Sequence, residues 1–433
     1  MVAHHQGRIA GPLDQDFTRR IVMQQIETMV IGGGQAGLAM SYYLGQLGRE
    51  HVVIERSRVA ERWQSERWAS LAFQSPNWNI RLPGFALQTA DQDAFASRDE
   101  VFQFIENYAA FIRAPLRCSL PANSLRRAPS SKALIVETPI GLFEAKNVVV
   151  ATGPFQLPVP PLTVGGAALN LHSSEYRSPQ SLPPGAVLVV GSGNSGAQIA
   201  EELCAAGRRV FLSVSKHRLI PRRYRGRDYT WWYLAFGEGE TTVDQCQEPP
   251  PARLLTGVGG GHDLHLRRLA ADGVVLLGRV VRGLDGRISI GDDLAENLAY
   301  ADASLADFTR QADGHVARMG LDLQPSDASA GVLHDPIEVN NPISILDLAA
   351  AGISTIIWAN GFRYDFNWID LPIFAAGSES SGRVPVHKRG ITAVPGVYFL
   401  GLPWLYRLKS AFLNGVGDDA KYLAELIAGD VRP

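Results

Sequence analysis

The sequence predicts an α/β fold with two Rossmann-like dinucleotide-binding domains, the second inserted into the first. Three observations carry this prediction. An apolar strand, a glycine-rich turn and a helix follow one another in residues 28–44, and the same order recurs in residues 187–203. Apolar strand patterns then resume late in the chain, in residues 354–369 and 395–404. The length of 433 residues is enough for two or three domains with separate cores.

The first unit begins with the strand Thr28–Ile31 and continues after its turn as the helix Leu38–Leu47. The turn has the spacing GxGxxG at Gly32, Gly34 and Gly37. In this pattern one glycine makes the tight turn, one lets backbone approach a pyrophosphate, and one lets the helix pack on the strand. The next strand, His51–Glu55, ends in an acid where the ribose hydroxyls of a dinucleotide are bound. The alternative interpretation is a glycine-rich turn without a ligand.

The second unit repeats the glycine spacing at Gly191, Gly193 and Gly196. Its second strand is Arg209–Ser215, and the position that corresponds to Glu55 is Val214, so no acid stands there. Hydroxyls and cations surround this position instead, at Ser213, Ser215, Lys216 and Arg218. A carboxylate would repel a 2′-phosphate and these groups would bind it, so we expect NADP in preference to NAD. The alternative is that these basic residues form a solvated loop.

Three further stretches predict helices. Ser97–Ile112 begins with a capping box of Ser97 and Glu100, Leu294–Gly320 is helix-prone, and Ala411–Gly429 closes the chain. Residues from about 230 to 335 fit no obvious repeat of the first unit and are interpreted as an insertion. We therefore expect a first domain of residues 27–157 and 345–433, a second domain of residues 158–344, and a mobile extension of residues 1–26.

Composition excludes several classes of partner. The net charge is −2, which gives no reason to expect binding to nucleic acid or to an anionic membrane surface. No apolar run approaches the roughly 18 residues of a membrane span, and residues 1–26 lack the core of a signal peptide. Cys118, Cys204 and Cys246 form neither a CxxC pair nor a metal-ligand cluster. We expect a cytoplasmic protein with reduced thiols and no metal site.

Two dinucleotide units, an Ala-Thr-Gly strand end in Asn147–Gly153 between them, and a late "FLG…GVGDDA" segment resemble the layout of flavin-dependent monooxygenases. The resemblance is greatest to the flavin-containing monooxygenases and the YUCCA-type plant enzymes. It covers most of the chain from Thr28 to Ala428. It implies FAD in the first unit and NADPH in the second, so that one nucleotide supplies a hydride and the other receives it.

The resemblance assigns residues to both sites. The residues matched to the FAD site are Gly32, Gly34, Gln35, Ala36, Gly37, Glu55, Arg56, Trp63, Thr152, Gly153 and Asp419. Those matched to the NADPH site are Gly191, Gly193, Asn194, Ser195, Gly196, Ser213, Ser215, Lys216 and Arg218. Gln74 falls where relatives carry Asn or His beside the flavin, and it is the predicted catalytic residue. The alternative is an amide that only satisfies loop backbone.

A further segment of the family signature matches in part. His172 and Tyr176 of "HSSEY" match its end, and Tyr176 favours the branch that oxygenates without inserting oxygen beside a ketone. The signature also has Phe and Gly upstream of the histidine, but Gly166 and Ala168 occupy those positions.

The resemblance implies an enzyme that reduces FAD with NADPH and reacts the reduced flavin with O₂ at C4a to form a (hydro)peroxide. This species then oxygenates a small organic substrate in a pocket that excludes water. Two alternatives stay open: an NADPH oxidase or reductase that transfers no oxygen, and a non-catalytic flavoprotein that senses NADPH. Substrate identity and homo-oligomerisation are likewise left open.

Overall fold

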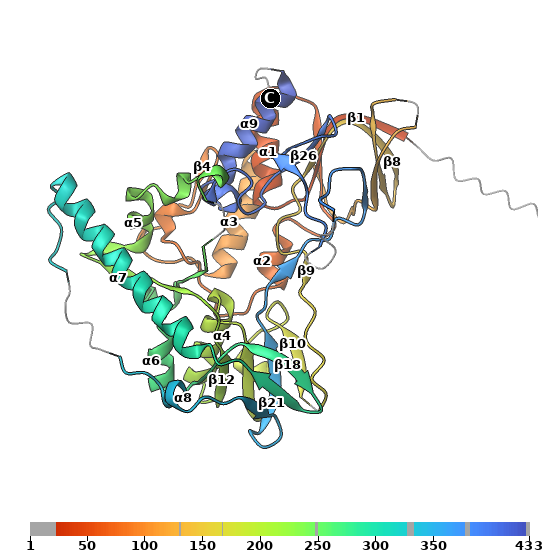
Figure 1. Cartoon of the computed structure of the whole chain (residues 1–433). Helices are drawn as coiled ribbons and strands as arrows, with labels where there is room; N and C mark the ends of the chain where they lie inside the picture. Colours follow the sequence, from red (N-terminus) through yellow and green to blue (C-terminus); the bar gives the residue numbers. More distant parts are fainter. Residues whose placement is uncertain are drawn as a thin grey trace, which may run out of the picture.

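The structure is a computed structural model that describes residues 23–129, 131–166, 168–246, 250–326, 333–376 and 382–429. Two domains lie one above the other in Figure 1, and two short crossings connect them. Residues 1–22 of the predicted extension lie outside the described residues. The first strand, β1 (Met23–Ile31), begins earlier than predicted, so residues 23–26 belong to the fold and not to the extension.

The first domain is built on five parallel strands in the order β26-β8-β1-β2-β5. Their bounds are β26 (Val397–Phe399), β8 (Gly141–Val150), β1, β2 (His51–Ile54) and β5 (Leu116–Arg117). The long strand β8 extends beyond this sheet and pairs antiparallel with β7 (Leu134–Thr138), which pairs with β6 (Ser124–Arg127). The carboxyl-terminal halves of the two central strands, residues 29–31 of β1 and 148–150 of β8, are apolar and buried, as expected of a parallel sheet covered on both faces.

Three helices cover this sheet, and their predicted positions are confirmed. They are α1 (Gln35–Gln46), α3 (Arg98–Phe111) and α9 (Val416–Ala428), with α9 packed along α1. The predicted capping box of α3 is present: the Ser97 hydroxyl accepts from the Glu100 N–H, and the Glu100 carboxylate accepts from the Ser97 N–H. Val101, Ile105 and Tyr108 form its buried face.

The second domain repeats the five-stranded parallel arrangement, in the order β10-β21-β11-β12-β17. Its strands are β10 (Leu169–His172), β21 (Ile353–Trp358), β11 (Ala186–Val190), β12 (Val210–Ser213) and β17 (Val275–Leu277). Two boundaries predicted from the sequence are therefore wrong. β21 pairs with β10 and β11, so the chain returns to the first domain after Trp358 and not at residue 345. β17 pairs with β12, so residues 230–335 are not one insertion but contain an integral strand of the domain.

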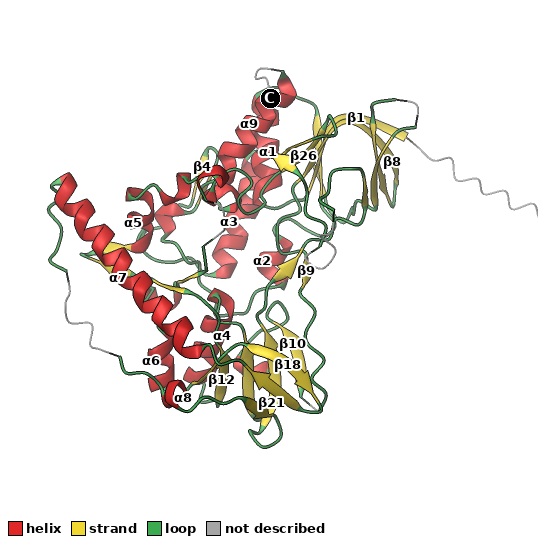
Figure 2. Ribbon diagram, in the orientation of Figure 1, coloured by secondary structure: helices red, strands yellow, loops and turns green. Residues whose placement is uncertain are grey.

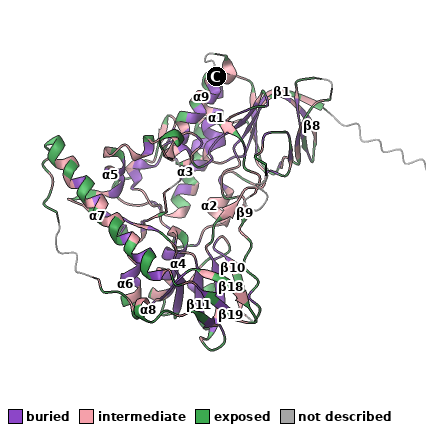
Figure 3. Ribbon diagram, viewed as in Figure 1, coloured by how far each residue is buried: buried purple, intermediate pink, exposed green. Residues whose placement is uncertain are grey.

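An antiparallel sheet of β18 (Val280–Leu284), β19 (Arg287–Ile290) and β20 (Ile345–Asp347) lies against the parallel sheet. Its inward residues share a core with alternate residues of β11 and β21. The helices α4 (Asn194–Ala205) and α6 (Leu266–Ala271) contribute to the core that contains the other residues of these strands. The buried layers and exposed edges can be followed in Figure 3.

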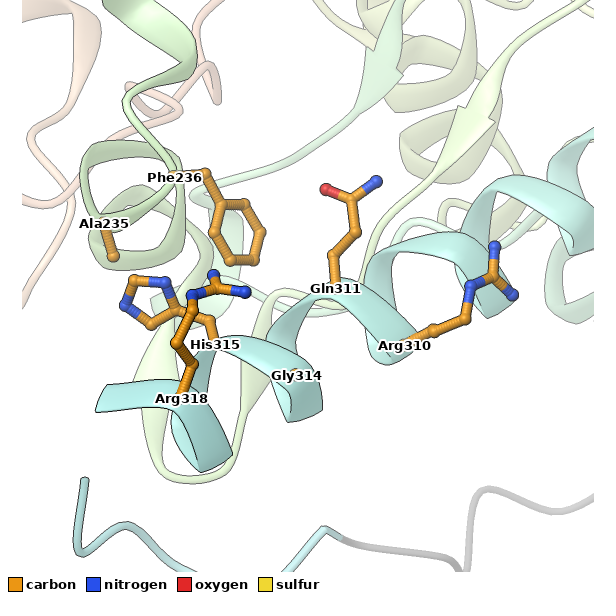
Figure 4. Close-up of a pocket in the computed structure, with 7 residues that line it drawn as sticks. All are labelled: Ala235, Phe236, Arg310, Gln311, Gly314, His315 and Arg318. Carbon is orange, nitrogen blue, oxygen red and sulfur yellow. The ribbon is translucent and has the colours of Figure 1, made fainter. Parts of the chain in front are cut away.

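Two helices extend the second domain. The helix α7 (Leu294–Met319), which the sequence predicted, ends at Gly320 and stands out from the body beside α5 (Tyr229–Ala235) (Figure 2). Trp232 of α5 and Phe308 of α7 are buried together. A pocket of about 470 Å³ opens between the two helices, where the rings of Phe236 and His315 meet edge to face (Figure 4). Its lining contains none of the predicted site residues.

The two crossings between the domains lie side by side. The first contains β9 (Leu157–Pro158) and the second contains β22 (Phe362–Arg363), and the two pair antiparallel.

Within the described residues, no helix is both long and apolar enough to span a bilayer. The remaining short elements are α2 (Glu61–Ser65), α8 (Ile337–Asn340), β3 (Arg81–Leu82), β4 (Phe85–Ala86), β13 (Arg218–Leu219), β14 (Arg223–Tyr224), β15 (Arg227–Asp228), β16 (Arg253–Leu254), β23 (Ile369–Asp370), β24 (His387–Lys388) and β25 (Ile391–Thr392).

Candidate dinucleotide-binding sites

The two glycine-rich turns occupy equivalent places in the two domains. Ile31, the last residue of β1, pairs with the ends of β2 and β8. Val190, the last residue of β11, pairs with the ends of β12 and β21 in the same way. Each turn thus leaves the central strand of its sheet at the carboxyl edge, which is where open α/β sheets bind their ligands.

The first and last glycines of each turn are required by close packing. Gly32 has φ +121°, and a Cβ there would overlap the carbonyl oxygen of Ala151. Gly191 has φ +102°, and a Cβ there would lie 2.6 Å from the carbonyl oxygen of Ala359. In both units a Cβ on the last glycine, Gly37 or Gly196, would overlap the carbonyl oxygen of the first. The sequence prediction did not include Ala359, whose counterpart is Ala151 at the end of β8.

The middle glycines, Gly34 and Gly193, differ from the others because a Cβ at either would meet no protein atom within 4 Å. They are the N-caps of α1 and α4, and neither cap makes a side-chain hydrogen bond to its helix. The first-turn N–H groups therefore face a space that a backbone can approach without a side chain in between. This is the arrangement that receives a pyrophosphate, so both turns fit a dinucleotide.

The predicted ribose-binding acid is held in place by backbone. Glu55 is half-buried, and its carboxylate accepts the Gly33 N–H at 2.8 Å and the Ser57 N–H at 2.9 Å. These bonds orient the carboxylate beside the first turn and leave acceptor sites on both oxygens. Arg56, the next residue, is exposed.

In the second unit a serine replaces this arrangement. Ser192, which corresponds to Gly33, is fully buried, and its hydroxyl accepts the Ser215 N–H at 2.9 Å and donates to the Ser215 carbonyl oxygen at 3.3 Å. Val214, which corresponds to Glu55, is buried in the core. The second unit thus fixes the end of β12 without any carboxylate. Sequence comparison of the two turns could have identified Ser192.

The four residues predicted to bind a 2′-phosphate do not share one environment. The Ser213 hydroxyl is buried, donates to the Gly278 carbonyl and accepts the Val280 N–H, both at 3.1 Å. This side chain is occupied by its own fold. Ser215 is half-buried, Lys216 is exposed with its ammonium over the Tyr300 ring at 4.5 Å, and Arg218 is half-buried in β13.

Arg218 belongs to a cluster with excess positive charge. It is the register partner of Arg253 in β16, and both guanidinium groups share the single carboxylate of Glu238. The Nε and one terminal nitrogen of Arg218, and the Nε of Arg253, are buried and find no hydrogen-bond partner among the residues that the structure describes. Burial lowers the pKa of Arg218, and the neighbouring Arg253 lowers it further. Two neighbouring arginines that share one carboxylate favour the binding of an additional anion.

Arg253 lies close to the second turn through Leu255. The Asn194 side-chain oxygen accepts the Leu255 N–H at 2.8 Å, and Gln198 donates to the Leu255 carbonyl at 2.6 Å. The predicted site residue Asn194 therefore attaches the segment after β16 to the first turn of α4. Ser195, next to it, is exposed.

Around the first turn, the other predicted residues make the following contacts. Gln35 donates to the Ala411 carbonyl at 2.6 Å. Ala36 packs against Gly401, and a Cβ added at Gly401 would lie 2.5 Å from the Ala36 Cβ. Asp419 is buried in the first turn of α9 and pairs with Arg389 at 3.3 Å. Burial raises the pKa of Asp419, and hydrogen bonding by Ser410 and the charge of Arg389 oppose this. Its carboxylate is thus engaged within the protein.

Three of the residues matched to the FAD site, Thr152, Gly153 and Trp63, lie near the contact between the domains. Gln156, which the prediction missed, donates to the Thr152 hydroxyl at 3.0 Å and the Gly153 carbonyl at 2.7 Å, and its side-chain oxygen accepts the Asp365 N–H. It thereby fixes the end of β8 to the second crossing. Trp63 packs against the cores of both domains.

Gln74 lies in a loop of the first domain that contacts the second. Its carbonyl oxygen accepts from the Arg222 guanidinium at 2.8 Å, and the residue is half-buried. No hydrogen bond of the Gln74 side-chain amide is found within the described part of the protein. The described residues also contain no group of three or more His, Cys, Asp or Glu placed to hold a metal ion.

Two relatives show how this chain compares in sequence. It is 32% identical to an uncharacterized CzcO-like oxidoreductase of Geobacillus kaustophilus, over 92% of this chain and 97% of that protein. It is also 32% identical to indole-3-pyruvate monooxygenase YUCCA8 of Oryza sativa subsp. indica, but over 46% of this chain and 50% of that one.

Solved structures with this fold include different activities. A flavin-containing monooxygenase from Stenotrophomonas maltophilia has a TM-score of 0.63 at 19% identity, covering 94% of this chain and 99% of its own. The bacillithiol disulfide reductase of Staphylococcus aureus has a TM-score of 0.59 at 14% identity, with coverages of 95% and 100%. OTEMO in complex with FAD and NADP has a TM-score of 0.52 at 15% identity, with coverages of 93% and 85%. These similarities show the fold.

A profile of the pyridine nucleotide-disulphide oxidoreductases matches residues 29–228, which contain both glycine-rich turns. Together with the relationship to the Geobacillus protein over nearly the whole length of both chains, this match shows that the chain belongs to the pyridine nucleotide-disulphide oxidoreductase family, among its CzcO-like oxidoreductases.

Proposed function

We propose that this oxidoreductase is a monooxygenase that binds FAD at the first turn and NADPH at the second. The observation that carries the proposal is the duplication of one phosphate-binding turn with opposite charge beside it. Glu55 presents a carboxylate at the first turn, whereas Lys216 and Arg218 lie near the second. A carboxylate suits ribose hydroxyls, and cations suit a 2′-phosphate.

The residues present fit both nucleotides. Gly34 and Gly193 leave open approaches to the helix N-termini, and Glu55 and the Arg218–Arg253 pair provide the groups that would bind the two adenosine ends. When bound, FAD supplies the hydride acceptor and the capacity to activate O₂, which no protein side chain offers. The chain's own part is to orient the two nucleotides and exclude water around Gln74.

The resemblance to YUCCA-type enzymes favours oxygen transfer over the alternatives. A disulfide reductase with a paired-cysteine centre is disfavoured because the sequence has no CxxC motif. A small thioether or carbonyl compound is the proposed class of substrate.

The test measures FAD content, NADPH oxidation, O₂ uptake and H₂O₂ release by the purified protein, with thioanisole as a probe substrate. The expected result is bound FAD and O₂ uptake that matches sulfoxide formed. H₂O₂ equal to NADPH consumed, across thioether and ketone probes, would support an oxidase instead. Bound nucleotides without turnover would support a sensor.

A further inference from the structure

The guanidinium group of Arg222 is a buried charge at the contact between the two domains. Its side chain is 2% exposed, and it forms a two-bond pair with Asp228, at 2.8 Å from Nε and 2.5 Å from a terminal nitrogen. The same terminal nitrogen is 3.4 Å from the Thr230 hydroxyl. A buried arginine with this many partners has one fixed orientation.

The remaining terminal nitrogen of Arg222 crosses to the first domain. It donates to the Gln74 carbonyl at 2.8 Å, while the guanidinium lies over the Phe95 ring at 5.0 Å. Gln74 and Phe95 belong to two loop segments that are hydrogen-bonded to each other, by Phe73 N–H to Ala96 and by Asn77 N–H to Ala94. Arg222 therefore holds both segments from the other domain.

Two segments connect Arg222 to the second glycine-rich turn. Residues 213–222 leave the end of β12, where Ser192 of the turn binds Ser215. Residues 253–263 are attached to the first turn of α4, where the Asn194 side-chain oxygen accepts the Leu255 N–H. The segments pair with each other through β13 and β16, and the Arg222 N–H donates to the Asp263 carboxylate at 2.5 Å.

The second of these segments also touches the same loop directly. A Cβ at Gly257 would overlap the Phe73 carbonyl oxygen and lie 2.8 Å from the Phe95 Cβ. At Gly261, where φ is +78°, a Cβ would lie 2.7 Å from the Phe95 ring and 3.1 Å from Arg222. Contact this close leaves the loop little freedom to move independently of the second domain.

We propose that Arg222 is a positioning residue that sets the Gln74 loop and transmits occupancy of the second nucleotide site to it. This proposal rests on the proposed function in one respect, the placement of Gln74 beside the flavin. A nucleotide that fixes the second turn also fixes Ser215 and Leu255, which are hydrogen-bonded to it. These two residues belong to the segments that pair through β13 and β16, and the paired segments in turn fix Arg222. The Phe73 and Gln74 carbonyls and the Phe95 ring are points where this order reaches the first domain.

Hydrogen–deuterium exchange of the backbone tests this without any turnover. The protein as purified is compared with Arg222→Gln, Asp228→Asn and Arg223→Gln, each with and without NADP⁺. Arg223 is the matched control, because it lies in the same basic stretch and, among the described residues, its guanidinium donates to the carbonyls of Gly260 and Gly261 within its own domain and to no group of the first domain. Asp228→Asn retains an N-cap for α5, which Asp228 provides by accepting the Thr230 N–H at 2.7 Å.

In Arg222→Gln we expect exchange in residues 71–80 to be at least tenfold faster than in Arg223→Gln, with Asp228→Asn between the two. NADP⁺ should slow exchange there in the unmodified protein and in Arg223→Gln, but not in Arg222→Gln. Equal exchange in the two arginine variants would overturn the positioning role. Protection by NADP⁺ that persists in Arg222→Gln, or that is absent from the unmodified protein, would overturn the transmission.

Two controls keep the outcomes separate. Unchanged exchange in β26 and α9 shows that Arg222→Gln is folded, and if it does not fold, Asp228→Asn carries the comparison with Arg223→Gln. Failure of oxygen transfer would refute the proposed function but would leave these exchange rates unaffected.

Discussion

The carboxylate of Glu55 accepts the backbone N–H of Gly33 at 2.8 Å, and this bond has no equivalent in the second glycine-rich turn. At the corresponding place in the second unit, the Ser192 hydroxyl binds the Ser215 backbone. The first unit thus closes its turn with a side chain that keeps free acceptor positions for a ligand. The second closes it with a buried hydroxyl, and under the proposed function recognition of the nucleotide falls to neighbouring cations. Under the proposed function, the same backbone would hold two nucleotides and still distinguish them.

Gly34→Val should abolish FAD binding without unfolding the protein. A Cβ at Gly34 meets no protein atom, so the branched side chain would fill only the space into which the pyrophosphate fits. Gly45→Val, at the other end of α1 and also free of contacts, is the control. We expect FAD content by absorbance to fall at least tenfold in the first variant only. Full flavin content in Gly34→Val would contradict the assignment of this turn.

Arg218→Ala should reduce the preference for NADPH over NADH. Each charge-assisted contact to the 2′-phosphate contributes about 1.5–3 kcal/mol, or roughly one to two decades in affinity. The control is Arg209→Ala, an exposed arginine immediately before β12, at the opposite end from its nucleotide edge. The ratio of kcat/KM for the two cofactors is the measurement. Equal ratios in the unmodified protein and in Arg218→Ala would exclude this residue from recognition.

Gln74→Leu should shift the reaction from oxygenated product to H₂O₂. The Gln74 carbonyl is held by Arg222, so the backbone position survives the change, while a donor available to a buried anionic oxygen is lost. FAD content and NADPH oxidation should stay near their original values. The measurement is H₂O₂ released per NADPH oxidised, with thioanisole present. An unchanged ratio would leave Gln74 with a role in the loop alone.

His265→Asn should make stability less sensitive to acid. Burial, together with the charge of Arg267, lowers the pKa of His265 to about 4. Below its ordinary pKa near 6.5 the unfolded chain takes up a proton that the folded chain refuses, so stability falls as pH falls toward 4. Asparagine preserves the N-cap that His265 provides for α6.

We therefore expect the unmodified protein to lose about 1–2 kcal/mol more than the variant between pH 7 and pH 5. Urea unfolding at the two pH values measures the difference. The same loss in both proteins would show that another group governs this range.

Local patterns in the sequence were sufficient for both turns, the capping box of α3 and the length of α7. They were not sufficient where a residue's role depends on strand pairing across the chain. β17 and β21 are short apolar strands whose place is set by β12 and β11, so the boundaries at 230–335 and 345 were wrong. The sequence predicts Ser213 as a group that binds the 2′-phosphate, but its hydroxyl bonds to Gly278 and Val280 instead. Local sequence does not reveal these partners, because the first of them lies 65 residues further along the chain. Arg222 lies within a basic stretch, and nothing in that local pattern indicates that its guanidinium group reaches the Gln74 carbonyl of the other domain.

The pairing of β9 with β22 has a mechanical consequence. Because the two crossings are hydrogen-bonded as neighbours, they act as one strap, and shear between the domains would break that strap. Gly153 and Gly361 stand at its ends with φ of +73° and +90°, conformations that glycine adopts without strain. In Figure 1, α5 lies on the opposite side of the molecule from β9. Glu240, which follows α5 in the chain, forms ion pairs with Arg407 and Lys409 of the first domain. Because the strap and these ion pairs join the domains at two separate places, we expect them to oppose shear between the two turns.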